Sequence, residues 1–313
     1  MSTATYAGVE MGGTKCICIL GTGPDDIREQ EIVQTGDPAS TLSSIADVLE
    51  RWSVATGDLE AIGVASFGPL DLRRDSRTYG RIGATPKERW KDVDLAGFFN
   101  KRFGVPVGFT TDVIGAALAE GRWGGAQRLT DFAYVTVGTG VGVGMVVAGS
   151  PVLGCHHPEL GHVRVVRAAG DHWPGNCRFH GDCVEGLASG PAIEARSGGL
   201  AMHLPPDSRI WDTVAHALAQ LAHILVVSVA PQRILMGGGV LNAQPHLFPR
   251  IRAYLRASLN GYLDIPEVTS GLDGYLVPPG LGTRAGPLGA LALAADTAAL
   301  RASASAKKPA RYV

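Results

Sequence analysis

The sequence predicts an α/β fold made of two similar halves, and three observations lead to this prediction. In the first third of the chain, apolar strand-like runs alternate with helical patterns, which is typical of strands linked by helical crossovers. From residue 132 the pattern starts again. Each half opens with two strand-like runs joined by a glycine-rich turn, so we expect an internal repeat.

The first half contains the clearer alternation. Its expected elements are, in chain order, strands at 5–13, 16–22 and 28–35, a helix at 40–52, a strand at 61–68, a helix at 95–103, a strand at 105–112 and an alanine-rich helix after Asp112.

The second half repeats the opening hairpin and then carries a long irregular insertion. Its expected elements are strands at 132–140 and 141–149, helices near 185–197 and 211–229, a strand at 233–239, a helix to about Leu259, a strand at 274–279 and a last helix from about Pro287. We expect an N-terminal lobe over 1–115, completed by a helix at 287–303, a C-terminal lobe over 116–286 with the insertion at 155–185, and a frayed tail at 304–313.

Composition excludes several functional classes. The 313 residues carry a formal net charge of −1, so bulk charge indicates neither a nucleic-acid partner nor a membrane surface. The most apolar run, 218–230, is short and contains Gln220 and His223, which favours a buried helix over a membrane span. We expect no signal peptide, and five cysteines in such a chain favour a reducing cytoplasm, where cysteine clusters more often bind metal than form disulfides.

Three glycine-rich turns are candidate phosphate or nucleotide contacts. The first, at 10–15, reads EMGGTK and adds a hydroxyl and a cation to a backbone that a ligand can approach closely. The second, at 138–144, reads GTGVGVG, and the third, at 236–240, follows a strand and opens a helix, where an anion or a flat base can lie. Each alone is equally an ordinary turn, but two such hairpins opening two similar halves favour a pair of lobes that hold a nucleotide's phosphates.

Asp112 stands at the end of a strand and just before a helix. By position alone, the commonest role there is that of a helix N-cap. The functional alternative is a carboxylate at the carboxyl edge of an α/β sheet, where ligands gather.

The insertion contains a candidate zinc site. Cys177, His180 and Cys183 lie three residues apart, and a Cys₂His₂ set is chemically ordinary for structural zinc. The cysteines are too far apart for the usual redox pair. Spacing alone leaves open which histidine completes the set; the candidates are His156, His157, His162 and His172.

These motifs together resemble the sugar kinases of the ROK family, specifically its bacterial fructokinase branch. The resemblance covers residues 8 to about 294 and rests on GVEMGGTK, ASFGPLD, YGRIGATPKERW, HPELGH and GNCRFHGDCVEGLASGP. It implies an actin-like, ribonuclease-H-like ATPase fold of two lobes with a zinc-bound insertion. It also implies an ATP-dependent hexose kinase, most simply a fructokinase, that uses Mg²⁺ with ATP, binds zinc structurally and forms a homodimer in the cytoplasm.

The resemblance assigns roles to individual residues. Asp112 would be the general base. The hexose would contact Gly68, Thr85, Pro86, Lys87, Glu159 and His162. ATP would lie against Gly12, Gly13, Thr14, Lys15, Gly138, Thr139, Gly140, Gly237, Gly238 and Gly239. Among the candidate histidines it selects His162 as the zinc ligand that joins Cys177, His180 and Cys183.

Three positions depart from the family pattern, and they keep alternatives open. Ile114 stands where relatives usually have Asn, and Thr283 and Arg284 replace the Asp-Asn of a common C-terminal motif. A kinase for glucose, mannose or a rarer ketose, or a non-catalytic sugar sensor, would also be compatible with these changes. Family repressors carry a DNA-binding domain before the kinase-like part, and the first hairpin begins near residue 6, so we expect no such domain here.

Overall fold

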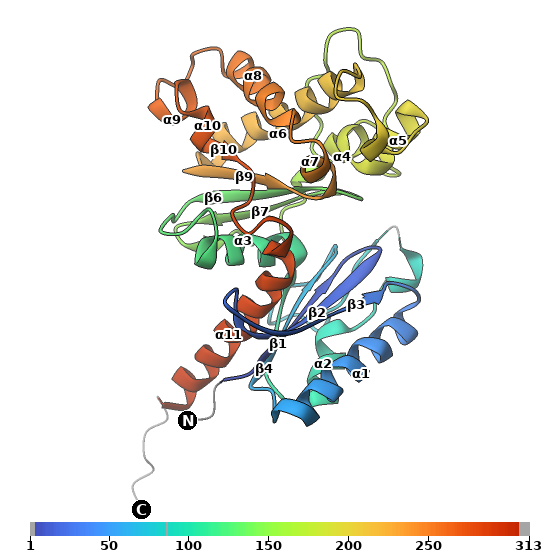
Figure 1. Cartoon of the computed structure of the whole chain (residues 1–313), viewed down its shortest axis with the longest axis vertical. Coiled ribbons are helices and arrows are strands. Elements are labelled where there is room, and N and C mark those ends of the chain that lie inside the picture. The colour runs from blue at the N-terminus through green and yellow to red at the C-terminus, as the bar shows by residue number, and fades with distance from the viewer. Residues whose placement is uncertain (1–3, 86, 307–313) are drawn as a thin grey trace, which may run out of the picture. The chain divides into compact units, whose positions relative to one another are not determined.

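A computed structural model of the chain describes residues 4–85 and 87–306. Each of the two predicted halves contains a five-stranded mixed sheet, and corresponding strands of the two halves have the same order (Figure 1). The first sheet has the order β3-β2-β1-β4-β5 and the second β8-β7-β6-β9-β10. In each sheet the first three strands of the half are antiparallel neighbours, and the last two run parallel to the first strand. This repeat confirms the α/β architecture expected from the sequence.

Eight strands lie within the predicted runs or overlap them closely, whereas β8 was not predicted and the strand expected at 274–279 has only two residues, because α10 continues to Tyr275. Their bounds are β1 Tyr6–Met11, β2 Lys15–Gly23, β3 Asp26–Gln34, β4 Ala61–Ser66, β5 Val107–Thr111, β6 Phe132–Val137, β7 Val141–Val147, β8 Ser150–Pro151, β9 Arg233–Gly237 and β10 Leu276–Val277.

The helices follow the predicted positions with two interruptions. Their bounds are α1 Pro38–Thr56, α2 Leu95–Phe103, α3 Asp112–Trp123, α4 Val184–Ala188, α5 Gly190–Ser197, α6 Ile210–Val229, α7 Gly239–Ala243, α8 Leu247–Leu259, α9 Pro266–Thr269, α10 Leu272–Tyr275 and α11 Ala285–Ala306. Short 3₁₀ turns are η1 Glu88–Trp90, η2 Leu160–His162, η3 Ala201–His203 and η4 Gly282–Arg284. The helix expected near 185–197 is divided because Ser189 caps α5, and the helix expected before Leu259 is divided at Gln244.

The chain forms two compact units. The first contains the described residues up to 123, the segment Cys155–His157 and the described residues from 284 onward. The second contains residues 124–154 and 158–283. Helix α11 therefore belongs to the first unit and extends three residues into the segment expected to fray; residues 307–313 lie outside the described part.

The sheet of the first unit is covered on both faces. Side chains of β1 and β4 such as Val9 and Val64 pack with α1 and α2. On the opposite face, one glycine from each of three neighbouring strands, Gly8, Gly63 and Gly108, stands in register, and α11 lies directly over this row with α3 beside it (Figure 1). This arrangement places the β1–β2 turn and the start of α3 at the same end of the sheet, because β1, β4 and β5 run parallel.

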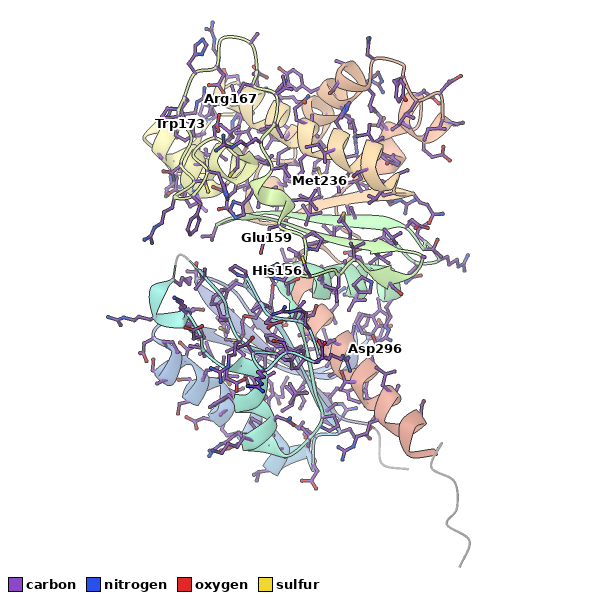
Figure 2. All side chains as sticks on the ribbon, turned by 180° about the vertical axis from the view of Figure 1, so that it is seen from behind. His156, Glu159, Arg167, Trp173, Met236 and Asp296 are labelled. Atoms are coloured by element: carbon purple, nitrogen blue, oxygen red, sulfur yellow. The ribbon has the colours of Figure 1, made fainter. Side chains whose placement is uncertain are left out.

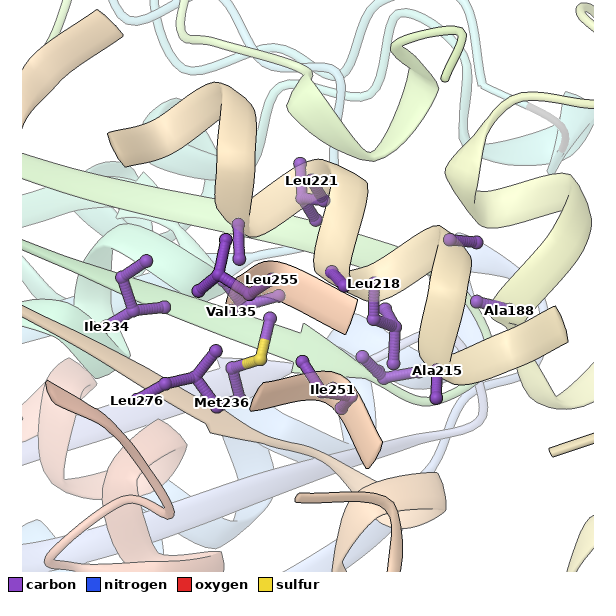
Figure 3. Close-up of a cluster of buried hydrophobic side chains, with 14 of the residues drawn as sticks. Val135, Ala188, Ala215, Leu218, Leu221, Ile234, Met236, Ile251, Leu255 and Leu276 are labelled. Atoms are coloured by element: carbon purple, nitrogen blue, oxygen red, sulfur yellow. The ribbon is translucent and has the colours of Figure 1, made fainter. Parts of the chain in front are cut away.

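The core of the second unit lies between its sheet and helices α6 and α8 (Figure 3). Val135 of β6 and Met236 of β9 pack among leucines of α6 such as Leu218 and Leu221. By length and composition alone α6 could cross a bilayer, but most of its apolar residues are buried in this core, as the sequence predicted for a buried helix, while Val227 near its end is exposed.

Candidate functional site

The first glycine turn is held by its own backbone and by Thr35, the residue that follows β3. The Gly12 N–H donates to the Lys15 carbonyl at 3.0 Å and closes the turn. At the end of β3, the Thr35 hydroxyl donates to the Gly12 carbonyl at 2.9 Å, and the Thr35 N–H donates to the Thr14 carbonyl at 3.0 Å. The side chains of Thr14 and Lys15 remain exposed at the tip. The turn is thus held in place while its tip is accessible to a ligand.

Asp112 is the first residue of α3, but it is not the residue that caps the helix. The Thr111 hydroxyl accepts the Ile114 N–H at 3.2 Å, which is the characteristic N-cap bond. The Asp112 carboxylate instead accepts the N–H of the next residue, Val113, at 2.9 Å. Burial raises the pKa of Asp112 to about 6, and the backbone hydrogen bonds oppose part of that rise. A carboxylate in this state is suited to accept a proton near neutral pH.

Glu10, at the end of β1, is a second carboxylate in this region. Burial and, to a smaller extent, the charge of Asp112 raise the pKa of Glu10, Lys15 lowers it, and the resulting pKa is about 7. Gly286 in the first turn of α11 lies against it: a Cβ there would stand 2.0 Å from Glu10 Oε1. The sequence did not single out Glu10 as a site residue, because only the fold brings its charge close to Asp112.

His157 contacts the turn at Gly68–Leu70, which contains the residue Gly68 that was expected to contact the sugar. Its Nε2 accepts the Leu70 N–H at 2.9 Å, and its ring lies 3.3 Å from where a Cβ on Gly68 would stand. His157 is 6% exposed, so this hydrogen bond is buried. Thr85 is buried and its hydroxyl accepts the Lys87 N–H at 3.4 Å. Pro86, also expected to contact sugar, lies outside the described residues.

In the second unit, the second glycine turn meets two other segments. The Gly138 N–H donates to Gly140 at 2.9 Å, and the Gly138 carbonyl accepts the Gly190 N–H at 2.7 Å at the start of α5. A Cβ on Gly138 would stand 3.9 Å from the Gly239 nitrogen. The second and third glycine runs are therefore side by side, as two parts of one ligand site would be. Thr139, between the two glycines of the turn, is exposed.

The three glycines of the third run have different surroundings. A Cβ on Gly237 would stand 2.6 Å from Pro279, and one on Gly238 would stand 2.5 Å from the backbone of Val137. Gly238 also has a φ of 92°, which favours glycine. Packing alone thus explains these two residues, whereas Gly239 faces open space.

Glu159 and His162 are placed by the glycine between them. A Cβ on Gly161 would stand 1.7 Å from the Val141 carbonyl oxygen, so η2 lies on the first residue of β7. Only glycine permits this approach. It brings η2 next to the start of β7, which follows the second glycine turn, and Glu159, which is labelled in Figure 2, is exposed directly before η2.

The four predicted metal ligands converge. Nδ1 of His162 lies 3.7 Å from Cys177 Sγ, 3.6 Å from Cys183 Sγ and 3.3 Å from Nδ1 of His180. The four donor atoms all lie within 4.8 Å of one another. A zinc tetrahedron with Zn–S bonds of about 2.3 Å and Zn–N bonds of about 2.05 Å has S–N edges of about 3.6 Å and N–N edges of about 3.3 Å. The donor set and its spacing fit a zinc ion.

Hydrogen bonds within the loop hold these donor atoms in place. Cys177 and Gly181 exchange backbone hydrogen bonds at 3.0 and 2.9 Å, which close a tight turn around His180. The Gly186 N–H points at Cys183 Sγ at 3.4 Å, a contact that stabilises a thiolate. His156, His157 and His172 lie outside this set among the described residues.

Glu185 is a site residue that the sequence did not identify. Its Oε2 accepts the Val141 N–H at 3.1 Å and lies 2.6 Å from where a Cβ on Gly140 would stand. Its Oε1 lies 4.0 Å from Nε2 of His162. Glu185 therefore lies between His162 and the second glycine turn. Its position two residues after Cys183 is a signal that could have pointed to it.

The departures from the family pattern lie in different settings. Ile114 is 3% exposed on α3, two residues after Asp112, so an apolar side chain occupies that position. Thr283 and Arg284 form η4, directly before α11 begins, and both side chains are exposed.

Comparison with known proteins places the chain among sugar kinases. The family model described as "ROK family" matches residues 6–297. A fructokinase from Pediococcus pentosaceus is 38% identical and aligns with 91% of this chain and 96% of its own length. A fructokinase from Streptococcus mutans is 37% identical over 94% of this chain and 98% of its own. A solved ROK hexokinase from Thermus thermophilus is similar with a TM-score of 0.75 and 27% identity, covering 96% of this chain and 99% of its own.

These matches span nearly the whole chain, and the solved relative has the actin-like ATPase fold that the repeated sheets indicate. The chain belongs to the ROK family of sugar kinases.

Proposed function

We propose that the protein is an ATP-dependent fructokinase, which transfers the γ-phosphoryl group of ATP to D-fructose and forms D-fructose 6-phosphate and ADP. The observation that carries this proposal is the identity of 37–38% to proteins named fructokinase over more than nine tenths of the chain. The placement of Asp112, the glycine turns and the metal set is consistent with it.

In this proposal, Asp112 accepts the proton of the attacking sugar hydroxyl. Its raised pKa keeps it a stronger base than an exposed aspartate while it is still largely ionised at neutral pH. General-base help of this kind is worth about 10²–10⁴-fold in rate. Thr111 makes the helix cap, so the Asp112 carboxylate is not committed to that structural task.

The glycine turns would hold the phosphates. Phosphoryl transfer depends mainly on in-line positioning and on charge stabilisation. The turn at Gly12–Lys15 offers backbone N–H groups, a hydroxyl and a cation, and Gly138–Gly140 with Gly239 offers further backbone. Mg²⁺ would accompany ATP and neutralise phosphate charge while it keeps most of its waters, so it needs few protein ligands.

Zinc would be held by His162, Cys177, His180 and Cys183, and its role would be structural, because four protein ligands fill its tetrahedral coordination. It would fix η2, so that Glu159 and the ring of His162 keep their orientation toward the sugar. Glu185 would orient the same ring from its other nitrogen.

We further propose that the enzyme is a cytoplasmic homodimer that acts on small molecules, without nucleic-acid or membrane partners. The family resemblance supports the dimer. The net charge of −1 and the five free cysteines support the rest.

A coupled assay of ADP release tests the proposal. Fructose, glucose, mannose and a rarer ketose would each be supplied with ATP and Mg²⁺, and a reaction without sugar would measure background ATP hydrolysis. We expect kcat/KM to be highest for fructose. Higher kcat/KM for another hexose would reassign the substrate, and ADP release that no sugar accelerates would favour a sensor over a kinase.

A further inference from the structure

Lys87 lies against the first glycine turn. The space above Gly13 is nearly empty: within 4 Å of the point where its Cβ would stand, the nearest described atom is Lys87 Cε, at 3.3 Å. Gly13 is the central glycine of the turn expected to face the phosphates. A flexible ammonium group at the end of this side chain is therefore within reach of whatever binds over Gly13.

This proximity is built into the fold. Lys87 directly precedes η1, and its carbonyl accepts the Trp90 N–H at 2.8 Å. The Trp90 indole donates to the Gly36 carbonyl at 3.1 Å, and the Trp90 side chain is buried. Gly36 follows Thr35, whose hydroxyl holds the Gly12 carbonyl. A continuous set of hydrogen bonds thus ties the segment that carries Lys87 to the base of the glycine turn.

No described carboxylate pairs with the charge of Lys87. Lys87 makes no ion pair with any residue that the structure describes. The charge of Lys87 nevertheless acts on the residue that follows the turn, Cys16. Burial raises the pKa of the Cys16 thiol, and the charge of Lys87 is one of the smaller influences that lower this pKa. A cation that lies beside the turn and pairs with no described carboxylate is suited to an anionic ligand.

We propose that Lys87 is a ligand of the phosphate groups of ATP, over Gly13, and that it stabilises the charge on the transferred phosphoryl group instead of binding the sugar. This inference rests on the proposed kinase function. The γ-phosphoryl group carries charge on its oxygens in the transition state, and a positioned cation lowers the barrier because it interacts more strongly there than in the ground state.

The test compares Lys87→Met with Lys87→Arg and with Lys91→Met. Lys91 lies four residues later, is exposed and pairs with no acidic residue in the described part of the chain, so it is a matched control for loss of one lysine charge. Methionine keeps the length of the side chain and removes its charge. We expect Lys87→Met to lower kcat on the order of 10²-fold and to leave the KM for fructose within about twofold. Lys87→Arg should recover most of kcat, and Lys91→Met should match the wild type.

Two results would overturn the inference. A raised KM for fructose with unchanged kcat would assign Lys87 to the sugar. Equal losses in Lys87→Met and Lys87→Arg, with lowered melting temperatures, would make its role structural. Calorimetric titration with Mg²⁺ and a non-hydrolysable ATP analogue separates this question from the proposed function: even if no sugar is phosphorylated, Lys87→Met should weaken analogue binding about tenfold, and unchanged binding would reject the inference.

Discussion

Gly63 of β4 and Ala290 of α11 are in direct backbone contact: a Cβ on Gly63 would stand 1.9 Å from the Ala290 carbonyl oxygen. Gly63 pairs in register with Gly8 on one side and Gly108 on the other. All three glycines lie under α11, where a Cβ would stand within 3 Å of helix atoms. The row of glycines is thus the surface on which the helix rests, and this contact fixes Glu10 beside the start of α11.

Gly63→Ala should therefore destabilise the protein. A methyl group there must displace the helix backbone, so we expect the free energy of unfolding to fall by about 2–4 kcal/mol, at the upper end for overpacked cores. Chemical denaturation measures this free energy, and circular dichroism of the native protein checks that the variant is folded. Gly199→Ala is the matched control, because nothing lies within 4 Å of its Cβ position; it should change stability by less than about 0.5 kcal/mol. Equal effects of both substitutions would refute the contact.

The glycine row shows what the sequence could and could not predict about the fold. The alternation of strands and helices predicted the two sheets. The pairing of Gly8, Gly63 and Gly108 depends on register between strands far apart in sequence, and the partner is a helix from the other end of the chain. Local patterns contain no information about such a contact.

The candidate site, like the fold, could be predicted from the sequence only in part. Cys177, His180 and Cys183 were predicted from spacing, because the three ligands lie on one short turn. His162 could be chosen only through the family resemblance, since it enters the cluster from a different segment. Glu185 was missed because its partners, His162 and Val141, are distant in sequence.

Asp112→Asn should abolish most turnover without harming the fold. Removal of the base is expected to lower kcat by about 10²–10⁴-fold. Because Thr111 makes the cap, the melting temperature should be unchanged or raised. In the wild type, kcat/KM should fall about tenfold per pH unit below about pH 6, where Asp112 becomes protonated. A variant that keeps more than a third of its turnover but melts earlier would make Asp112 a helix cap.

Glu10→Gln should stabilise the protein above neutral pH. Its pKa is raised from 4.5 in the unfolded chain to about 7, so the folded state holds the proton more tightly, and wild-type stability falls as the pH rises through this window. At pH 8 the variant should exceed the wild type by about 1–3 kcal/mol, and the difference should vanish near pH 4. Denaturation at both pH values measures it. Glu29→Gln, at an exposed position of β3, should show no difference at either pH.

His157→Leu should weaken the turn at Gly68–Leu70. It removes the acceptor of the buried Leu70 N–H, and an unsatisfied buried donor costs about 1–3 kcal/mol. His157→Gln retains an acceptor at similar reach and should lose less stability. We also expect His157→Leu to raise the KM for sugar. If both variants have the melting temperature of the wild type and bind sugar as well as it does, the hydrogen bond does not support the turn.

The purified protein should contain about one zinc ion per chain, measured by elemental analysis, because its four donor atoms have the spacing of a zinc tetrahedron. Cys177→Ser removes one thiolate and should release the metal, since structural zinc affinity depends on the full ligand set. Cys155→Ser is the control, because Cys155 is exposed and outside the cluster, and its metal content should match the wild type.

Loss of zinc should raise the KM for sugar more than the KM for ATP, because the ion would fix η2 with Glu159 and His162, while the turn at Gly12–Lys15 is held by Thr35. Equal increases in both KM values would refute this division of roles, and a wild type that is fully active without metal would refute the zinc site itself.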